Sequence, residues 1–153
     1  MKKMNILLAF LFIAVYGCSR EEVPEETGSG NEDYTSLLVD GVYLIDDTDG
    51  GGYISASNLA LISGDFDNAT LILSIANVTA PGTFILSSSD DASYQINSPF
   101  ENYNLDNPGS HLTVVITEIY PGTLKGLKGT FEGELYNDAG DFITITDGQF
   151  EDH

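Results

Sequence analysis

Asp46, Asp47 and Asp49 stand close together in the sequence and are followed by three glycines. Carboxylate oxygens on a flexible glycine loop suit Ca²⁺, which takes roughly six to eight oxygen ligands. These aspartates are therefore a candidate Ca²⁺ site, although the third acid and the closing glutamate of an EF-hand loop are missing. The same residue types also favour a solvated turn. Residues 65–68 and 90–91 carry weaker versions of the same acidic pattern.

Cys18 is the only cysteine of the chain, and it follows a segment with the plan of a secretory signal peptide. Lys2 and Lys3 give a positively charged start, and a short apolar run from Ile6 to Val15 comes next. The order V-Y-G-C that ends at Cys18 resembles a bacterial lipobox, in which the cysteine becomes the lipidated first residue of the mature protein. The apolar run is too short for a permanent transmembrane helix, and ordinary cleavage would leave an unpaired thiol. We therefore predict a lipoprotein signal peptide over residues 1–17 and a lipid on Cys18.

Residues 18–33 are predicted to be the lipidated cysteine followed by a disordered acidic tether. The segment is rich in acids, Gly and Ser and has almost no apolar residues to bury. A charged segment of this kind serves as a solvated spacer. The stretch S-R-E-E at 19–22 also resembles the export signal that follows the lipid cysteine in surface lipoproteins of Bacteroidetes. We expect a lipid-anchored protein of the outer membrane that is exposed at the cell surface.

Net charge limits the partners of the mature chain. Loss of Lys2 and Lys3 with the signal peptide changes the formal charge from −19 to −21. A chain this acidic repels phosphate backbones, which argues against nucleic acid as a partner. It also repels anionic membrane surfaces, so a covalent lipid on Cys18 must hold the protein at the membrane. The remaining expected partner is a glycan or a surface protein.

Short runs of alternating apolar and polar residues fill the chain after the tether, with no sustained helical period. We predict strands at residues 37–39, 42–45, 53–62, 70–77, 83–86, 94–96, 112–119, 129–136 and 141–150. They form a single all-β domain over residues 34–153, an antiparallel β-sandwich or small β-barrel of eight to nine short strands. In the last strand, Ile143 and Ile145 are expected to face inward beside Phe142 and Phe150.

Residues able to catalyse hydrolysis are few. His111 and His153 are the only histidines, and with no cysteine in the domain they lack the clustering of a zinc site. Glu118, Glu132 and Glu134 include pairs that could serve glycoside hydrolysis. Glu132 and Glu134, however, lie on one strand face that is expected to point to solvent. No Gly-x-Ser-x-Gly nucleophile elbow occurs, and we predict that the protein is not an enzyme.

Aromatic residues suggest two binding functions. Tyr94, Tyr103 and Tyr120 lie in or near predicted loops, where aromatic rings can stack on sugars. The alternative is ordinary packing at strand edges, where tyrosine buries its ring and keeps its hydroxyl wet. If the domain closes into a barrel, its interior offers another site, for a small apolar ligand.

The end of the chain resembles a known domain family. L-K-G-T-F-E-G-E-L at 127–135 and I-T-I-T-D-G-Q-F at 143–150 are similar to the close of a family of Bacteroidetes lipoprotein domains, in which a G-T-F strand pairs with a final I-T-x-G-x-F strand. V-D-G at 39–41 is similar to the opening of that family. The resemblance implies an all-β fold and a cell-surface address, and the family is of unknown function with no catalytic residues to transfer.

Together these observations predict a non-enzymatic outer-membrane or cell-surface lipoprotein with an interaction or structural role. The alternatives are a carbohydrate- or Ca²⁺-dependent binding module, or a barrel that holds a small apolar ligand. No cofactor other than Ca²⁺ is expected.

Overall fold

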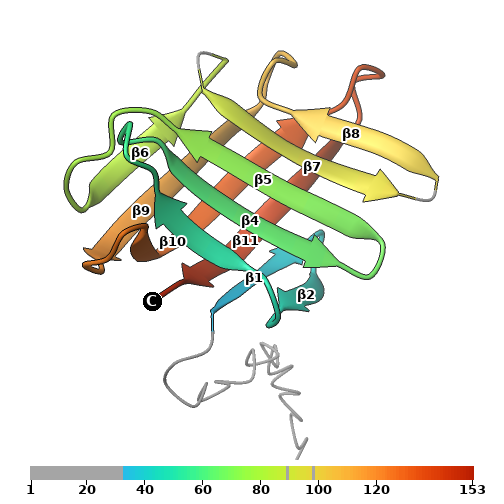
Figure 1. Cartoon of the computed structure of the whole chain (residues 1–153). Coiled ribbons are helices and arrows are strands. Elements are labelled where there is room, and N and C mark those ends of the chain that lie inside the picture. The colour runs from blue at the N-terminus through green and yellow to red at the C-terminus, as the bar shows by residue number, and fades with distance from the viewer. Residues whose placement is uncertain (1–32, 89, 98) are drawn as a thin grey trace, which may run out of the picture.

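The computed structural model describes residues 33–88, 90–97 and 99–153, which form eleven antiparallel strands and no helix (Figure 1). The expected all-β antiparallel fold is confirmed. The strands are β1 (Tyr34–Val39), β2 (Val42–Asp46), β3 (Gly51–Ile54), β4 (Ala60–Phe66), β5 (Ala69–Ile75), β6 (Gly82–Leu86), β7 (Asp91–Asn97), β8 (Phe100–Asn104), β9 (His111–Ile119), β10 (Lys125–Tyr136) and β11 (Phe142–Glu151). The predicted signal peptide, Cys18 and all of the tether except Asp33 lie outside the described residues. Within the described part, no helix is long and apolar enough to cross a membrane.

The strands belong to one hydrogen-bonded sheet that folds into two facing layers. One layer has the order β6-β9-β10-β11-β1-β2, and the other has the order β3-β4-β5-β7-β8. Figure 1 shows the second layer in front, with its strands crossing those of the first. β10 joins the layers at both of its ends, because Lys125 pairs with Ile54 of β3 and Tyr136 pairs with Asn104 of β8. The result is a sandwich with the partial closure of a barrel.

Glycines let β10 approach its neighbours closely. A Cβ atom at Gly129 would lie 2.1 Å from the carbonyl oxygen of Val115 and 2.6 Å from the ring of Phe150. A Cβ atom at Gly133 would lie 2.2 Å from the carbonyl oxygen of His111. Such distances exclude a side chain, so glycine marks the points where the β9 and β10 backbones meet.

Inward-facing side chains form one hydrophobic core between the layers. The period of two is clear in β5, where Leu71 and Leu73 are fully buried while Ile72 faces outward. The largest fully buried side chains are Phe131, Phe150, Leu37, Ile62, Leu71, Leu73, Leu86, Leu112, Ile116, Leu127, Leu135 and Ile145. They occupy the interior in which a barrel would hold an apolar ligand, and each contributes about 1.5–3 kcal/mol by burial.

The structure has eleven strands where eight to nine were expected, two more than the nine predicted ranges. The segment 53–62 divides into β3 and β4, because Asn58 adopts a positive φ of 59° and residues 55–59 turn back on themselves. β8 lies in a stretch expected to be a loop. Its sequence F-E-N-Y-N buries only Tyr103, and asparagine is depleted in strands, so the segment carries little strand signal.

Gly129→Ala should lower the free energy of unfolding by about 2–3 kcal/mol, because the added methyl group has no room beside Val115 and Phe150. Gly82→Ala is the matched control, since its Cβ atom would meet nothing closer than 3.9 Å. Urea unfolding followed by tyrosine fluorescence gives both values. Equal free energies of unfolding for the two variants would show that close approach at Gly129 does not constrain the fold.

Candidate functional site

The outward side of the six-stranded layer, hereafter the outer face, carries rows of side chains set by strand register. One row runs across all six strands through Thr83, Val115, Thr130, Gln149, Ser36 and Ile45. A second row joins Ile85, Thr113, Glu132, Leu38 and Tyr43, with a bulge of β11 between Glu132 and Leu38. Neighbouring strands are about 4.8 Å apart, so the face is roughly 24 Å wide. Glu132 is the only charged residue among those named, and the bulge adds Asp147 beside it.

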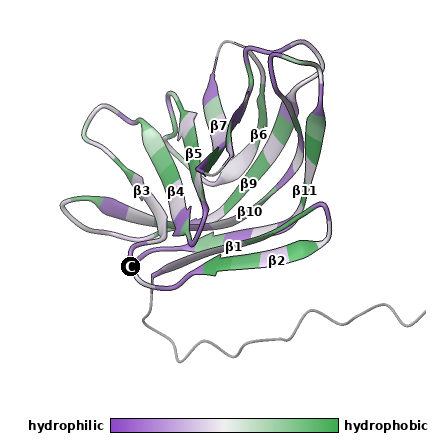
Figure 2. Cartoon of the chain, turned by 90° about the vertical axis from the view of Figure 1, so that its right-hand side faces the viewer, coloured by the Kyte–Doolittle hydropathy of each residue, from purple (hydrophilic) through white to green (hydrophobic). Residues whose placement is uncertain are grey.

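The two margins of the outer face are edge strands with exposed apolar residues. Tyr43 and Ile45 of β2 are 41 % and 40 % exposed, and Ile85 of β6 is 77 % exposed. Figure 2 shows the hydrophobic colour that runs along β2. The outer face is therefore apolar at both margins and polar at its centre.

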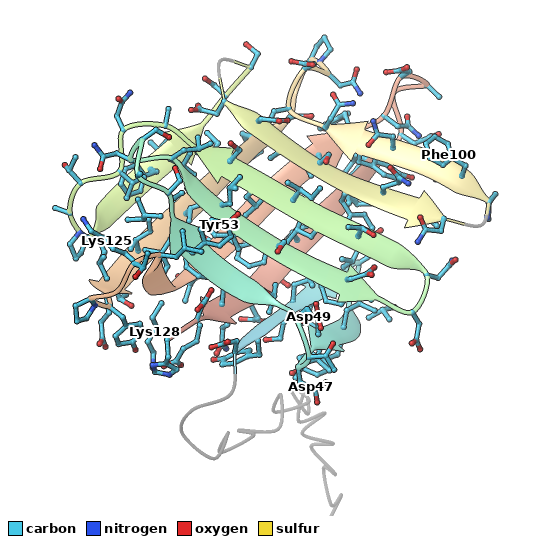
Figure 3. The ribbon with its side chains drawn as sticks, viewed as in Figure 1. Asp47, Asp49, Tyr53, Phe100, Lys125 and Lys128 are labelled. Carbon is cyan, nitrogen blue, oxygen red and sulfur yellow. The ribbon has the colours of Figure 1, made fainter. Side chains whose placement is uncertain are left out.

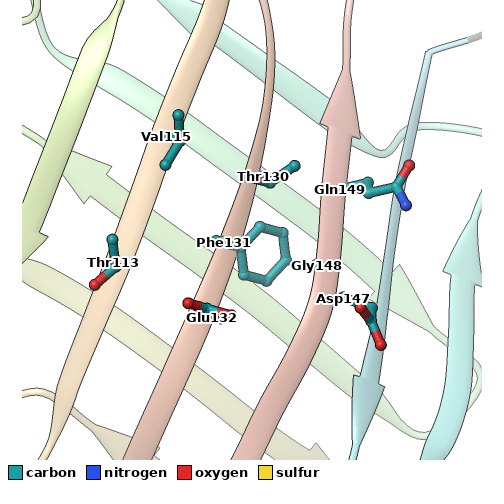
Figure 4. Close-up of a pocket in the computed structure, with 8 residues that line it drawn as sticks. All are labelled: Thr113, Val115, Thr130, Phe131, Glu132, Asp147, Gly148 and Gln149. Atoms are coloured by element: carbon teal, nitrogen blue, oxygen red, sulfur yellow. The ribbon is translucent and has the colours of Figure 1, made fainter.

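A pocket of about 300 Å³ lies at that centre, over β9, β10 and β11 (Figure 4). It is lined by Thr113, Val115, Thr130, Phe131, Glu132, Asp147, Gly148 and Gln149. In this view the ring of Phe131 lies between β10 and β11, and the polar side chains lie around it. The pocket thus combines a small apolar floor with a polar rim.

A β-bulge in β11 shapes the pocket. Two β11 residues, Thr146 and Asp147, stand opposite Glu132 alone. Asp147 adopts a φ of 51°, a conformation that Asp and Asn tolerate better than most residues. A Cβ atom at Gly148 would lie 2.7 Å from the ring of Phe131, so the position next to the bulge requires glycine.

The polar side chains of the pocket keep their hydrogen-bonding capacity. Within the part of the chain that the structure describes, no hydrogen bond or ion pair involves the side chains of Thr113, Thr130, Glu132, Asp147 or Gln149. All of these except the half-buried Thr113 are exposed. They present carboxylate, amide and hydroxyl groups to solvent at one place.

An aromatic pair stands on the outer face at one end of β10 and β11. Tyr136 and Phe142 are register partners, and their rings stack with centroids 5.3 Å apart. Phe142 is 52 % exposed, so the expectation that it lies inward beside Ile143 is wrong. Ile143 is buried, and the alternation of side chains along a strand sends the preceding residue outward.

A charged cluster surrounds Glu151 at the other end of β10. The Glu151 carboxylate accepts hydrogen bonds from Lys128 Nζ at 2.9 Å and from the Tyr120 hydroxyl at 3.0 Å, and it lies 3.1 Å from His153 Nε2. Burial raises the pKa of Glu151, but the hydrogen bonds from Lys128 and Tyr120 outweigh it and hold the pKa below its usual value. The rings of Tyr120 and His153 have centroids 4.5 Å apart. Tyr120 therefore belongs to a packed cluster, in which its ring already contacts the ring of His153 and its hydroxyl is bonded to Glu151.

Tyr94 and Tyr103 are wrong as sugar-stacking candidates. Their side chains belong to the core and are only 4 % and 5 % exposed. They face each other across β7 and β8. Tyr94 was placed at the start of a short predicted strand because β7 begins three residues earlier than expected, and Tyr103 was placed in a loop because β8 was not expected. The Tyr103 hydroxyl donates a hydrogen bond to Glu101 at 2.5 Å, which together with burial raises its pKa to about 12.

Asp46 closes a turn rather than facing solvent. Its Oδ1 accepts hydrogen bonds from Thr48 N at 3.1 Å, Thr48 Oγ1 at 2.9 Å and Asp49 N at 3.3 Å, and its Oδ2 accepts from Asp65 N at 2.8 Å. Burial raises the pKa of Asp46, but these hydrogen bonds together lower it below its usual value. Asp47 and Asp49 have exposed side chains beside β1 and β2 (Figure 3). Both oxygens of Asp46 are thus already engaged within the protein.

Other acidic candidates also close turns. Asp65 Oδ1 accepts a hydrogen bond from the Thr70 hydroxyl at 3.1 Å, and Asp90 Oδ2 accepts one from Ser87 N at 3.1 Å. Among residues 33–88, 90–97 and 99–153, no three His, Cys, Asp or Glu side chains are grouped to hold a metal ion. Ca²⁺ binding therefore stays a prediction from sequence that this geometry does not support.

Three of the residues considered for catalysis, His111, Glu132 and Glu134, lie near one another on the outer face. His111 stands opposite Glu134 across β9 and β10, and Glu132 is the next outward residue along β10. Glu118 and His153 lie toward the other end of β10, near Glu151. The expectation that Glu132 points to solvent is confirmed, since its side chain is exposed.

Asp46→Asn should lower the free energy of unfolding by about 1–3 kcal/mol near neutral pH, because an amide replaces a charged acceptor of four hydrogen bonds. The folded-state pKa of Asp46 is lowered, so this contribution is present above the ordinary value of 3.8 and is lost as the pH falls through the folded-state pKa. Urea unfolding between about pH 3 and pH 7 should show the difference from wild type shrinking at the acid end. The exposed Asp47, changed to Asn, is the control, and a difference independent of pH would refute this role for Asp46.

The pocket residues come from three strands and were not grouped by sequence reasoning. One signal was present, since Asp147-Gly148 interrupts the alternation of the last strand in the manner of a bulge. Chemically, the arrangement can bind a ligand on an open surface through several hydrogen bonds.

No protein-family model, curated protein or solved structure matches the chain.

Proposed function

We propose that the protein is a non-enzymatic lipoprotein of the outer membrane and cell surface, attached by a lipid on Cys18, whose β domain binds a partner on its outer face. The observation that carries the binding role is the pocket, where five polar side chains retain unused hydrogen-bonding capacity. The apolar margins on β2 and β6 extend the same face beyond the pocket. These exposed apolar residues would add contact area for a partner that is bound at the polar centre.

The anchor is supported by the signal-like segment ahead of Cys18 and by the charge of −21 left after its removal. A single acyl chain gives only marginal membrane binding, so a stable anchor needs the additional chains that bacterial lipoproteins carry. Asp33 Oδ1 accepts a hydrogen bond from His153 N at 3.0 Å. The tether would thus leave the domain at the Glu151 end of the outer face, with Phe142 at the far end.

Binding is favoured over catalysis by the openness of the site. Glu132 lies on an exposed strand face, and most of the polar side chains that line the pocket are exposed to solvent. General acid–base chemistry on glycosides gains from a site that excludes water and shifts a carboxylic acid's pKa upward. A site that presents hydrogen-bonding groups to solvent suits recognition instead.

Cys18→Ala should abolish incorporation of labelled fatty acid and release the domain from the membrane fraction or leave the precursor uncleaved. The reason is that an acidic domain has no electrostatic attraction to an anionic membrane. Fractionation and detergent-phase partitioning with Triton X-114 measure the outcome. Persistent incorporation of labelled fatty acid by the variant would rule out the lipid on Cys18.

Changing Glu21 and Glu22 together to Gln should leave the lipid in place but reduce surface exposure, if the acidic stretch after Cys18 directs export. Protease digestion of intact cells measures exposure, and fatty-acid labelling confirms the anchor. Changing Glu25 and Glu26 to Gln removes the same charge farther along the tether and serves as the control. Equal loss of protease accessibility in both variants would point to total charge rather than to an export signal.

A further inference from the structure

The lining of the pocket both donates and accepts hydrogen bonds. Glu132 and Asp147 offer carboxylate acceptors, Gln149 offers an amide that does both, and Thr113 and Thr130 offer hydroxyls that do both. None of these side chains is already hydrogen-bonded among the described residues. A fitting ligand must therefore donate and accept several hydrogen bonds within a small area.

Charge narrows the class of ligand. Neither Lys125 nor Lys128 lines the pocket, and Lys128 is already paired with Glu151 (Figure 3). A chain with a charge of −21 therefore repels anions at this site. An ammonium group would be attracted by the two carboxylates, but it only donates hydrogen bonds and so would leave the donors of Gln149 and the threonines to water. An apolar ligand would cover the carboxylates without hydrogen-bonding them, which costs several kcal/mol.

We infer that the outer face binds a neutral glycan, with sugar hydroxyls on Glu132, Asp147 and Gln149 and the C–H side of a ring against Val115. Adjacent hydroxyls of a sugar donate to a carboxylate and accept from an amide or hydroxyl, which matches the lining group by group. The half-buried Val115 lies beside Thr130 in the pocket and supplies apolar contact. This inference rests on the proposed function and specifies its ligand.

The exposed ring of Phe142 is a second, independent feature that fits a glycan. Phe142 lies beside Tyr136 on the same outer face, and Glu134 lies between Tyr136 and Glu132 along β10. Glu132 and Tyr136 are four residues apart, which in a strand is about 13 Å. An aromatic ring at that distance suits a sugar unit beyond the one in the pocket. The ligand is therefore an oligosaccharide that lies along β10.

An array of neutral oligosaccharides, probed with the detergent-solubilised mature protein, tests this inference directly. Heparin fragments serve as polyanionic probes and chitosan oligosaccharides as cationic probes. We expect retention on at least one class of neutral oligosaccharide, followed by a Kd from calorimetry. Retention on the charged probes alone, or on no probe, would overturn the inference.

Two changes to the site test its residues. Glu132→Gln combined with Asp147→Asn should weaken binding of the retained glycan about tenfold, since hydrogen bonds to charged groups are lost. Asn tolerates the φ of 51° at position 147, so the fold should persist. The double variant removes two negative charges, so a polyanionic ligand would bind it more tightly than it binds wild type. An increased affinity of the variant for the retained ligand would therefore overturn the inference.

Phe142→Ala should weaken binding of a hexasaccharide about fivefold and leave a disaccharide unaffected, because only the longer ligand reaches from the pocket to the aromatic pair. Phe100→Ala is the matched control, since Phe100 is 69 % exposed on β8 in the other layer (Figure 3). Equal losses for the two phenylalanine variants would place the ligand elsewhere and overturn the inference.

The inference and the proposed function fail in different ways. Cleavage of the retained oligosaccharide, detected by chromatography, would refute the non-enzymatic role while leaving glycan recognition intact. A different result would be that the protein retains no glycan but captures a cell-surface protein, and that Thr130→Lys abolishes this capture. That result would support a binding role for the outer face and overturn the inference that its ligand is a glycan.

Discussion

The sharing of β10 between the two layers is the constraint on which the rest of the structure depends. Its long edges pair with β9 and β11, while its two ends pair with β8 and β3. At Gly129 and Gly133 the backbones of β9 and β10 approach so closely that a side chain would not fit between them. The same strand then presents Glu132 and Thr130 at the centre of the outer face. The fold and the candidate binding surface therefore depend on one strand.

Part of the protein's acidity has a structural cause. An antiparallel fold needs many tight connections, and each leaves backbone N–H groups that require acceptors. Asp46 caps the turn before β3, Asp90 caps the turn after β6, and Asp40 accepts a hydrogen bond from Thr144 N at 2.9 Å. Aspartates that sequence patterns suggest as cation ligands thus act as acceptors for the chain itself. Glu132 and Asp147 differ, because their carboxylates face solvent with no partner among the described residues.

Local patterns predicted most of the strands because the period of two is a property of neighbouring residues. Phe131 and Leu135 are buried and Thr130 and Glu132 are exposed, as the alternation in this strand indicates. Prediction failed at β8, where Asn residues replace the usual strand formers and only Tyr103 faces the core. That failure left Tyr103 as a candidate for sugar stacking, because β8 buries a ring that a loop would expose.

By itself, the sequence determined the all-β class, the acidic charge and the alternation of faces, since each depends on composition or on adjacent residues. It also carried the signal-like segment that ends at Cys18. Only the tertiary structure decided which strands lie side by side, because register depends on pairing between residues far apart in the chain. Thr113, Glu132 and Gln149 form one pocket through the pairing of β9, β10 and β11 and the bulge of β11. The same pairing buried Asp46 under backbone N–H groups and left Phe142 on the surface.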